Sequence, residues 1–518
     1  MLPPLLIFLL LCFISCFSFF MILGRLIRTN NKFASSSLPY YGPKTYPIIG
    51  CLYDYFKNRH NLLDWYTHLL QESPTQTILI SRLGARRTIV TANPVNVEYI
   101  LKTNFNNYPK SKPFTEILRD FLGNGIFNVD GELWSTQRKL VSHQFSAKAL
   151  QDHVLNDLKE VMDEKLIPLL ESLANTQQQK AVDLQDILRR MGFDIICKFS
   201  LGFDPDCLLD HHHSVSFLPV MEAFDIASKV CAKRGAEPVS AIWKFKKFLG
   251  VGSEKSLKES VEMIHSSIID IIHEKKKYFN NNARDLLSKM IMLEEDEEAI
   301  RDMVISFIMA GKDTTSSALT WLFYILTCHP EIEDEVVKEL KSLENQKLLE
   351  FETLKQLRYL MACLCECLRL YPPVAWDSKH ALVDDFLPDG GKICAGDRVT
   401  YFQYGMGRMV NLWGEDRFEF RPERWIIHLD LEEEGDEHIV GPLKKISPYK
   451  FSVFQAGPRT CLGKEMAFIQ MKYIVAMLLK KFKFRPVDSE NSPKFVPLLT
   501  AHMHGGFWAF VERRDQFQ

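Results

Sequence analysis

The sequence lacks an excess of either charge, and this absence narrows the classes of protein to consider. It holds 63 lysine and arginine residues against 65 aspartate and glutamate residues, a formal net charge of −2. Proteins that bind nucleic acid usually carry a clear basic excess, so the composition gives no support to that class. The chain also has no internal repeat and no glycine-rich dinucleotide-binding motif, so we expect no nicotinamide or flavin module within it.

A disulfide framework is lacking too. The 12 cysteines are scattered along the chain, which is typical of reduced cysteines in a cytosol-facing protein. Cys363, Cys365 and Cys367 recur at every second position, but a helix would spread them over different faces, so we expect no metal site there. Residues 211–213 are three histidines with polar and acidic neighbours, and we expect them in an exposed loop.

The chain does contain one long uncharged apolar run, at residues 2–24. Its length is sufficient to span a bilayer. Positive charges follow the run, at Arg25, Arg28 and Lys32, rather than precede it, which favours a retained anchor over a cleaved secretory signal. By the positive-inside rule, the N-terminus would face the lumen and the body of the protein would remain in the cytoplasm.

Three regions are expected along the chain. Residues 1–24 form the anchor, residues 25–50 a basic stop and a hinge stiffened by proline and glycine, and residues 51–518 one globular domain. Two short apolar runs within residues 77–91 predict a β-hairpin. Residues 105–129, interrupted by glycine and proline, predict a long irregular connection. Helical patterns dominate elsewhere, so the fold class is mainly α with a minor β portion.

The most informative motif lies near the C-terminus, where Phe454 begins the run F-Q-A-G-P-R-T-C-L-G. It presents a single cysteine, Cys461, just ahead of an apolar helix expected over residues 464–482. A helix N-terminus and a nearby arginine would lower the pKa of this thiol. Gly457 and Gly463 would let the backbone approach a flat ligand closely. Lone cysteines are usually small buried hydrophobes, but this spacing indicates a metal-bound thiolate.

A second motif interrupts a very long helix, expected over residues 299–328. Its middle reads A-G-K-D-T-T from Ala310, and glycine, aspartate and threonine are poor helix formers. Thr314 lies four residues after Ala310, so its hydroxyl can compete for that carbonyl and open the helix locally. The alternative is a polar patch on a surface helix, which the apolar flanking residues argue against.

Two further pairs have helical spacing. Glu366 and Arg369 lie three residues apart on one face, and Arg424 supplies a second arginine downstream. A surface ion pair of this kind would contribute under about 1 kcal/mol, whereas a buried network would be needed for folding. Trp134 and Arg138 lie four residues apart and point the same way.

Together these motifs resemble the cytochrome P-450 superfamily of haem-thiolate monooxygenases, over nearly the whole chain. The resemblance implies the P-450 fold with an N-terminal membrane anchor, haem b with its iron bound by Cys461, and dioxygen held at the notch of the long helix. It implies that Thr314 and Asp313 relay protons to the bound oxygen. It also implies that Glu366, Arg369 and Arg424 form a triad that braces the fold behind the haem loop.

The resemblance carries further haem-binding positions onto this chain. Arg138 and Arg459 would pair with the haem propionates, and lysine stands at residue 379, where many relatives have a propionate-binding arginine. Lysine keeps the charge there but loses the forked geometry. The expected haem-binding residues are Cys461, Trp134, Arg138, Arg459, Phe454 and Lys379.

Because the chain has no electron-donating module, the resemblance implies a separate membrane-bound NADPH–cytochrome P-450 reductase as partner. Basic residues near the thiolate loop are candidates for its docking face, namely Lys139, Lys444, Lys445 and Lys450. The implied compartment is the endoplasmic reticulum membrane, crossed once, with the catalytic domain in the cytosol.

For the substrate, several stretches resemble the plant fatty-acid ω-hydroxylase clan, among them Y-P-P-V-A-W-D-S-K from Tyr371 and Y-G-M-G-R-M from Tyr404. The branch of this clan that the chain resembles includes hydroxylases of long-chain fatty acids, of jasmonoyl-amino-acid conjugates and of sterol side chains at C-26. We expect oxidation at or near the terminal carbon of a fatty acid, with the other two as alternatives. The stretch G-G-F-W from Gly505 departs from the clan's usual smaller residues. The expected pocket residues are Phe114, Phe121, Phe307, Ala310, Trp376 and Met503.

Two other functional classes remain open. One is a haem-thiolate isomerase or lyase that acts on hydroperoxides without a reductase, and the other is a non-catalytic haem-binding or scaffold protein. An intact Asp313-Thr314 pair and an unbroken thiolate loop favour the monooxygenase over both.

Overall fold

The computed structural model describes residues 40–146, 154–175, 180–209, 217–237, 239–278, 285–293, 296–343, 350–427, 441–488 and 491–514. The expected anchor, most of the hinge, the three histidines and the acidic run at residues 432–437 lie outside the described residues. Among the described residues, none of the helices combines the length and the apolar character that crossing a bilayer requires.

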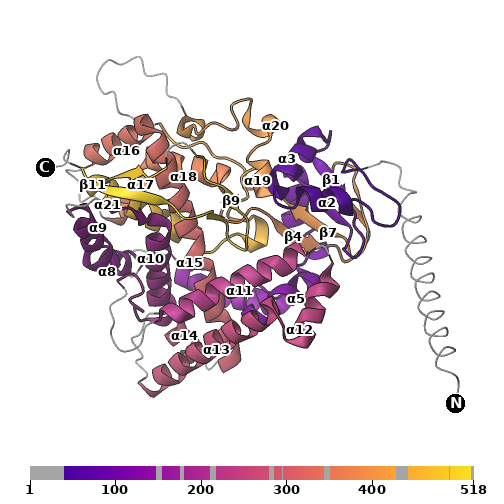
Figure 1. The fold of residues 1–518 in the computed structure, drawn as a ribbon, viewed down its shortest axis with the longest axis horizontal. Coiled ribbons are helices and arrows are strands. Elements are labelled where there is room, and N and C mark those ends of the chain that lie inside the picture. Colours follow the sequence, from indigo (N-terminus) through magenta and orange to yellow (C-terminus); the bar gives the residue numbers. More distant parts are fainter. Residues whose placement is uncertain are drawn as a thin grey trace.

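Helices form most of the described body, which confirms the predicted fold class (Figure 1). Most of them gather around α15, and the sheet that contains β1 lies to one side of that bundle. The helices run as follows: α2 (Leu52–Asn58), α3 (Leu62–Glu72), α4 (Pro94–Glu98), α5 (Ser111–Leu122), α6 (Gly131–Ser142), α8 (Leu155–Val161), α9 (Ile167–Ala174), α10 (Leu184–Leu201), α11 (Leu218–Ala236), α12 (Ser240–Leu249), α13 (Ser253–Lys277), α14 (Leu286–Met292), α15 (Glu297–Cys328), α16 (Pro330–Ser342), α17 (Phe351–Gln356), α18 (Arg358–Leu370), α19 (Gln403–Met406), α20 (Val410–Trp413) and α21 (Lys464–Lys481).

The largest sheet has the strand order β1-β2-β7-β4, built from β1 (Thr77–Ile80), β2 (Thr88–Thr91), β4 (Asp377–His380) and β7 (Arg398–Tyr401). β1 and β2 are antiparallel, with Thr77 opposite Thr91, so the predicted hairpin is confirmed. β2 and β7 run parallel. The smaller sheets pair β3 (Val182–Asp183), β11 (Trp508–Arg513) and β8 (Phe482–Pro486), β5 (Asp385–Phe386) with β6 (Lys392–Ile393), and β9 (Phe495–Val496) with β10 (His502–Met503).

The expectation of an irregular connection at residues 105–129 was wrong, because α5 occupies its middle. Phe114, Leu118, Phe121 and Leu122 recur at the spacing of one helix face. The proline in this segment stands in the first turn of α5, where it removes no intrahelical hydrogen bond. The proline and glycine that suggested a loop therefore mark the two ends of a helix.

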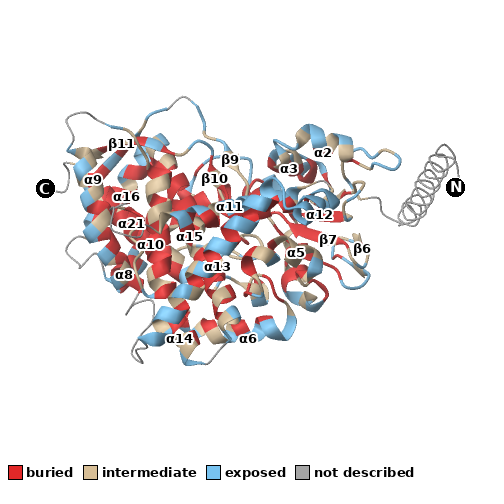
Figure 2. Cartoon of the chain, turned by 60° about the horizontal axis from the view of Figure 1, so that its bottom comes forward, coloured by how far each residue is buried: buried red, intermediate tan, exposed pale blue. Residues whose placement is uncertain are grey.

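The long helix predicted at residues 299–328 is confirmed as α15. It begins two residues earlier because the Asp296 side chain accepts hydrogen bonds from the N–H groups of Glu298 and Ala299. Figure 2 shows α15 and its neighbour α10 with many buried residues in the interior of the body. The two helices cross closely at Gly311, where a Cβ atom would lie 2.5 Å from the Ile196 side chain.

Candidate functional site

The cysteine motif forms a short loop between the sheet region and α21. A helical turn, η7 (Gly457–Arg459), precedes Cys461, and the N–H of Cys461 donates to the carbonyl oxygen of Phe454 at 2.8 Å. The side chain of Cys461 has exposed surface although protein surrounds it on most sides. The thiol is therefore accessible to a ligand.

The two glycines of this loop serve different purposes. Gly457 has a φ of +65°, and a Cβ atom there would lie 2.0 Å from the carbonyl oxygen of Leu101. A side chain at this position would therefore collide with the chain itself. At Gly463 a Cβ atom would only reach ordinary contact distance, 3.7 Å from the Phe145 ring and 3.9 Å from the Cys461 sulfur.

Burial raises the pKa of the Cys461 thiol above its ordinary value. The N–H of Gly463 and the charges of Arg138 and Lys464 lower the pKa, but by less. The prediction that the loop and its arginine suffice to depress this pKa was therefore wrong. A bound metal ion deprotonates a coordinating thiol outright, so the environment of Cys461 fits a residue whose thiolate form depends on a metal ligand bond.

The motif in the middle of α15 has the hydroxyl contact that the sequence predicted. Thr314 Oγ1 donates to the carbonyl oxygen of Ala310 at 2.8 Å. The helix nevertheless continues through this segment without interruption. The predicted local opening of the helix is absent because a threonine hydroxyl can share a carbonyl with the backbone N–H that already binds it.

Asp313, beside Thr314, is surrounded by positive charge. Its Oδ1 atom lies 2.7 Å from Lys312 Nζ and 3.5 Å from Arg189 Nε. Burial alone would raise the pKa of Asp313, but Lys312 and Arg189 outweigh that effect and hold the pKa below its ordinary value. Asp313 is therefore a carboxylate held in an ion-pair network, and sequence reasoning missed both of its partners.

Cations from separate elements gather beside the cysteine loop. Arg138 of α6 donates to the carbonyl oxygen of Thr460 at 2.6 Å. Arg459 contacts Asp130 at 2.7 Å, and its guanidinium lies 4.4 Å from the centre of the Trp134 ring. The structure thus brings together three residues that the sequence predicted as haem contacts, although Trp134 and Arg138 lie more than 300 residues before Arg459.

Lys379, the residue that departs from the family pattern, is buried and lies 2.8 Å from Asp377. Asp377 also accepts from Tyr401 at 2.8 Å and from Gln455 at 3.1 Å. Although burial alone would raise it, the pKa of Asp377 is lowered by the charges of Lys379 and Lys110. Asp377 and Lys379 alternate on one strand and so share a face, a signal that could have found this partner.

Lys110 is a buried cation that sequence reasoning missed entirely. It is 8% exposed and donates to the carbonyl oxygen of Phe127 at 2.8 Å. Its pKa is lowered to about 7, chiefly by burial; Asp377 opposes this shift, and the charges of Lys379 and Arg459 add to it. Nothing in the local sequence distinguishes Lys110 from an exposed lysine, because its burial depends on strands far along the chain.

The charges of this region fit haem. Arg138, Arg459, Lys379 and Lys110 are basic, whereas Asp130 and Asp377 are the acidic groups near them, so basic groups outnumber acidic ones. A buried charge is costly unless it is paired. Haem carries two propionate carboxylates, which would balance this excess, and the Cys461 thiol would bind its iron.

Glu366, Arg369 and Arg424, the predicted triad, are in contact through Glu366. Glu366 accepts from Arg369 at 2.8 Å through both carboxylate oxygens, and from Arg424 Nε at 3.2 Å. Glu366 also accepts from the indole N–H of Trp425 at 2.8 Å. Glu366 and Arg369 are 0% and 1% exposed, so the triad is a buried network rather than a surface pair. Its arginines additionally bind backbone carbonyls, which ties α18 to the segments that precede the cysteine loop.

The expected pocket residues are distributed over three hydrophobic clusters. Phe114, Phe121 and Phe307 belong to one cluster, in which the Phe121 ring lies 5.5 Å from Phe224 of α11. Met503 belongs to a second, where its backbone is bonded to the Gln185 side chain. Trp376 packs in the third cluster, 6.0 Å from Phe402. Ala310, half-buried on α15, is the first residue of the A-G-K-D-T-T motif.

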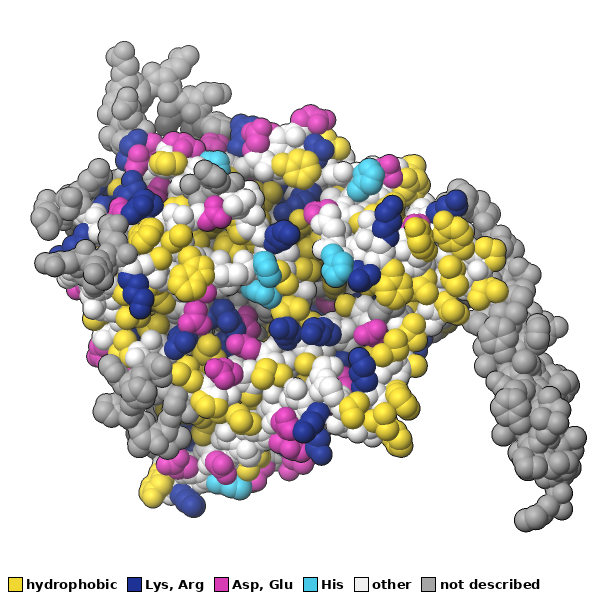
Figure 3. All heavy atoms as spheres, in the orientation of Figure 1, with side chains coloured by type: hydrophobic (Ala, Val, Ile, Leu, Met, Phe, Trp, Pro, Cys, Tyr) yellow, Lys and Arg dark blue, Asp and Glu magenta, His cyan; other side chains and the backbone are white. Residues whose placement is uncertain are grey.

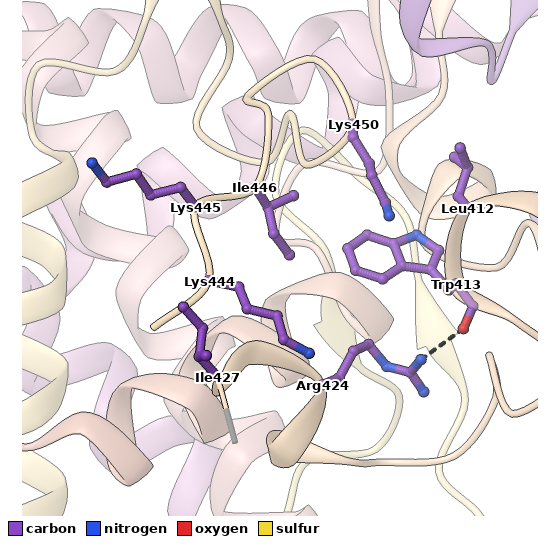
Figure 4. A pocket seen from close by; sticks show the side chains of 8 residues that line it. All are labelled: Leu412, Trp413, Arg424, Ile427, Lys444, Lys445, Ile446 and Lys450. Carbon is purple, nitrogen blue, oxygen red and sulfur yellow. Dashed lines mark hydrogen bonds between the residues drawn. The ribbon is translucent and has the colours of Figure 1, made fainter. Parts of the chain in front are cut away.

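Three of the four lysines expected to form a docking face line one surface hollow of about 510 Å³. Figure 4 shows Lys450 next to the indole of Trp413, whereas the Lys445 side chain extends away from it; the ammonium of Lys450 lies 4.5 Å from the ring centre. Arg424, a member of the triad, forms part of the wall and donates to the Trp413 carbonyl at 2.6 Å. Lys139 lies exposed on α6 and does not line this hollow.

Comparison with known proteins agrees with this arrangement. The family model described as Cytochrome P450 matches residues 41–504. The chain is 52% identical over 479 residues to Cytochrome P450 94B1 of Arabidopsis thaliana, with 92% of each chain covered. It is 51% identical over 480 residues to Cytochrome P450 94B3 of the same plant, again with 92% coverage of each. It is 42% identical over 479 residues to Cytochrome P450 94A1 of Vicia sativa, with 91% coverage of each.

Proposed function

We propose that this chain, which belongs to the cytochrome P450 family, is a monooxygenase that hydroxylates the terminal or near-terminal carbon of a long-chain fatty acid. The resemblance inferred from its motifs is confirmed by the family match and by relatives more than 50% identical. The observation that carries the proposal is the gathering of basic side chains, Arg138, Arg459, Lys379 and Lys110, near the loop that presents the Cys461 thiol.

We assign haem binding to the cysteine loop and the basic residues near it. Cys461 would hold the iron, while Arg138, Arg459, Lys379 and Lys110 would hold the two propionates. When bound, haem with a thiolate ligand supplies the activation of dioxygen for insertion into a C–H bond.

Proton movement is assigned to α15. Thr314 Oγ1 holds a proton next to the Ala310 carbonyl, and Asp313 would resupply it from the ion-pair network. Most other residues of α15 are buried, which limits the routes by which water can bring protons to the oxygen site.

The substrate is proposed from the character of the neighbouring side chains. Phe114, Phe121 and Phe307 lie in one apolar cluster that includes α11 and α15, and such a lining suits a long hydrocarbon chain. A jasmonoyl-amino-acid conjugate or a sterol side chain would also present a long apolar portion, and these are the alternative substrates.

Electrons would come from an NADPH–cytochrome P-450 reductase. The basic hollow containing Lys444, Lys445 and Lys450 supports docking of an acidic partner, because none of the three is paired with an acid among the described residues. Reversing the charge of Lys444 and Lys445 should raise the reductase concentration needed for half-maximal turnover. The matched control reverses Lys255 and Lys258, exposed on α13. Equal effects of the two pairs would contradict this docking face.

We further propose that residues 1–24 anchor the protein in the endoplasmic reticulum membrane with the catalytic domain in the cytosol. Exposed apolar side chains lie near the beginning of the described chain, including Ile48, Tyr53 and Phe56. Figure 3 shows hydrophobic groups gathered at that side of the molecule, which supports a location next to a bilayer. Cell fractionation with protease protection tests this proposal, since a lumenal domain would resist protease in sealed vesicles.

The experiment that tests the function is product analysis by mass spectrometry. Microsomes containing this chain and a plant reductase would receive NADPH and an equimolar mixture of oleic acid, jasmonoyl-isoleucine and 22-hydroxycholesterol. We expect a terminally hydroxylated fatty acid. Oxygenation of the conjugate or the sterol alone would refute the proposed substrate, and product formed without NADPH would place the chain in the isomerase or lyase class.

A further inference from the structure

One exposed serine lies at the rim of the basic hollow. Ser447 stands between Lys445 and Lys450 in the chain, in the run K-K-I-S-P-Y-K. Its neighbour Ile446 lines the hollow together with the lysines, and Figure 4 shows Ile446 between Lys445 and Lys450. The carbonyl oxygen of Ser447 accepts from the N–H of Lys450 at 3.0 Å. A group attached to the Ser447 hydroxyl would therefore lie beside the cations of the hollow.

The backbone that leads to Ser447 has few hydrogen bonds. Within the described part of the chain, the N–H groups of Lys445, Ile446 and Ser447 have no hydrogen-bond partner, and these residues belong to no helix or strand. A segment with few backbone hydrogen bonds opens at low cost in free energy. An enzyme can therefore bind residues 445–448 in an extended form without unfolding the body of the protein.

Three serines of this chain are followed by proline, and they differ in exposure and in the residues that follow. Ser73 is buried, and its hydroxyl donates to the Thr77 carbonyl at 2.7 Å. Ser492 is exposed but has phenylalanine three positions later, whereas Lys450 stands three positions after the exposed Ser447. Proline-directed kinases act on a serine that precedes proline, and the cyclin-dependent class also selects a basic residue at that third position. Ser447 meets all of these requirements.

We propose that Ser447 is a phosphorylation site and that its phosphate weakens docking of the reductase. A proline-directed kinase would transfer the γ-phosphoryl group of ATP to Ser447 Oγ. The bond from the γ-phosphorus to the bridging oxygen breaks, the hydroxyl proton is released, and ADP leaves. This role of Ser447 rests on the proposed docking of the reductase at the hollow and on the proposed cytosolic location, where ATP is available.

The charge of a phosphate is large compared with the charge of the hollow. Phosphoserine carries about −1.5 to −2 charges at pH 7. Lys444, Lys445 and Lys450 supply the positive charge that an acidic partner would meet, since Arg424 is already bonded to two acids. One phosphate among these three lysines therefore cancels more than half of their attraction for an acidic surface.

A charge change at Ser447 tests the effect on docking. Ser447→Glu adds a negative charge, and the matched control Ser447→Gln adds a side chain of the same shape without charge. The measurement is the reductase concentration that gives the half-maximal rate of haem reduction in the holoenzyme. Ser447→Glu should raise this concentration about two- to fivefold, and less at high salt, because salt screens exposed charges. Equal values for Ser447→Glu and Ser447→Gln overturn the proposal.

The modification is tested with the full-length holoenzyme, a purified cyclin-dependent kinase, ATP and Mg²⁺. Mass spectrometry of peptides should find phosphate on Ser447 and none on the buried Ser73. The phosphorylated protein should need more reductase than Ser447→Glu does, because phosphate carries more charge than a carboxylate. Ser447→Ala treated with the kinase should need the same concentration as untreated wild type. Absence of phosphate from Ser447 refutes the site.

Reversing the charge of Lys444 and Lys445 separates failure of this role from failure of the docking face. If that reversal raises the required reductase concentration but phosphate on Ser447 does not, the docking face stands and the role of Ser447 is refuted. If neither change has an effect, the docking face itself is wrong. Loss of the carbon monoxide spectrum of thiolate-bound haem in Ser447→Glu would trace its effect to damage of the haem site and would also refute the proposal.

Discussion

Replacing Arg369 with methionine would remove the central cation of the triad from a site without solvent. Arg369 is 1% exposed, and it donates to both oxygens of Glu366 and to the carbonyl oxygens of Arg417 and Glu419. Methionine fills part of the volume but leaves the carboxylate of Glu366, which is 0% exposed, with Arg424 as its remaining cation.

The expected cost follows from this burial. Breaking a buried ion pair by removal of one partner costs about 3–5 kcal/mol, a large share of a typical total stability of roughly 5–15 kcal/mol. The fraction of unfolded protein should rise by a factor of about 10² to 10⁴. For a body of this length, the entropy of unfolding is about 1 kcal/mol per degree, so the melting midpoint should fall by roughly 3–5 °C.

The assay is thermal unfolding followed by circular dichroism and tryptophan fluorescence, together with the soluble yield. The matched control is Arg485→Met, which breaks an exposed pair with Glu512 at 2.9 Å and should cost under about 1 kcal/mol. If Arg369→Met melts within a degree of the control, Glu366 and Arg369 do not brace the fold.

Three other predictions concern the site. Cys461→Ser should retain the far-UV circular dichroism spectrum but lose the reduced carbon monoxide spectrum of thiolate-bound haem, since a serine hydroxyl does not ionise there; an unchanged spectrum would assign the iron to another ligand. Thr314→Ala should bind haem yet release reduced oxygen as peroxide, because the hydroxyl beside Ala310 is gone; tightly coupled turnover would contradict the relay. In haem-free protein, Lys110 has a pKa of about 7 against 10.5 when unfolded, so the unfolded chain binds more protons between these values, and stability should rise with pH by up to about 1.4 kcal/mol per unit. Lys110→Met should remove this rise in urea unfolding measured across that window, and identical slopes for variant and wild type would refute the burial of an uncompensated charge.

The sequence predicted correctly those helices and strands that depend on short runs of neighbouring residues. The hairpin of β1 and β2 follows from two short apolar runs, and α15 follows from a long apolar helix with an acidic start. The same reasoning did not predict α5. Its proline and glycine suggest a loop when the sequence is considered alone, but they lie at the two ends of the helix.

In the site, the sequence predicted only those residues that belong to short motifs. The cysteine loop, the triad and the threonine–carbonyl contact are encoded at short spacing. Lys110 is not, because it is buried by contacts that include His380, 270 residues further along the chain. The pKa of Cys461 was misjudged for the same reason, since its burial is a property of the assembled fold.

The central claim, that this chain inserts one atom of dioxygen into an organic substrate, is tested most directly by isotope labelling. The full chain with its reductase and NADPH would be given oleic acid under ¹⁸O₂ in ordinary water, and the hydroxylated product would be analysed by mass spectrometry. The account predicts one labelled oxygen atom in each product molecule and none when the label is supplied as H₂¹⁸O under ordinary dioxygen. Product labelled from water, or product formed equally without NADPH, would contradict it.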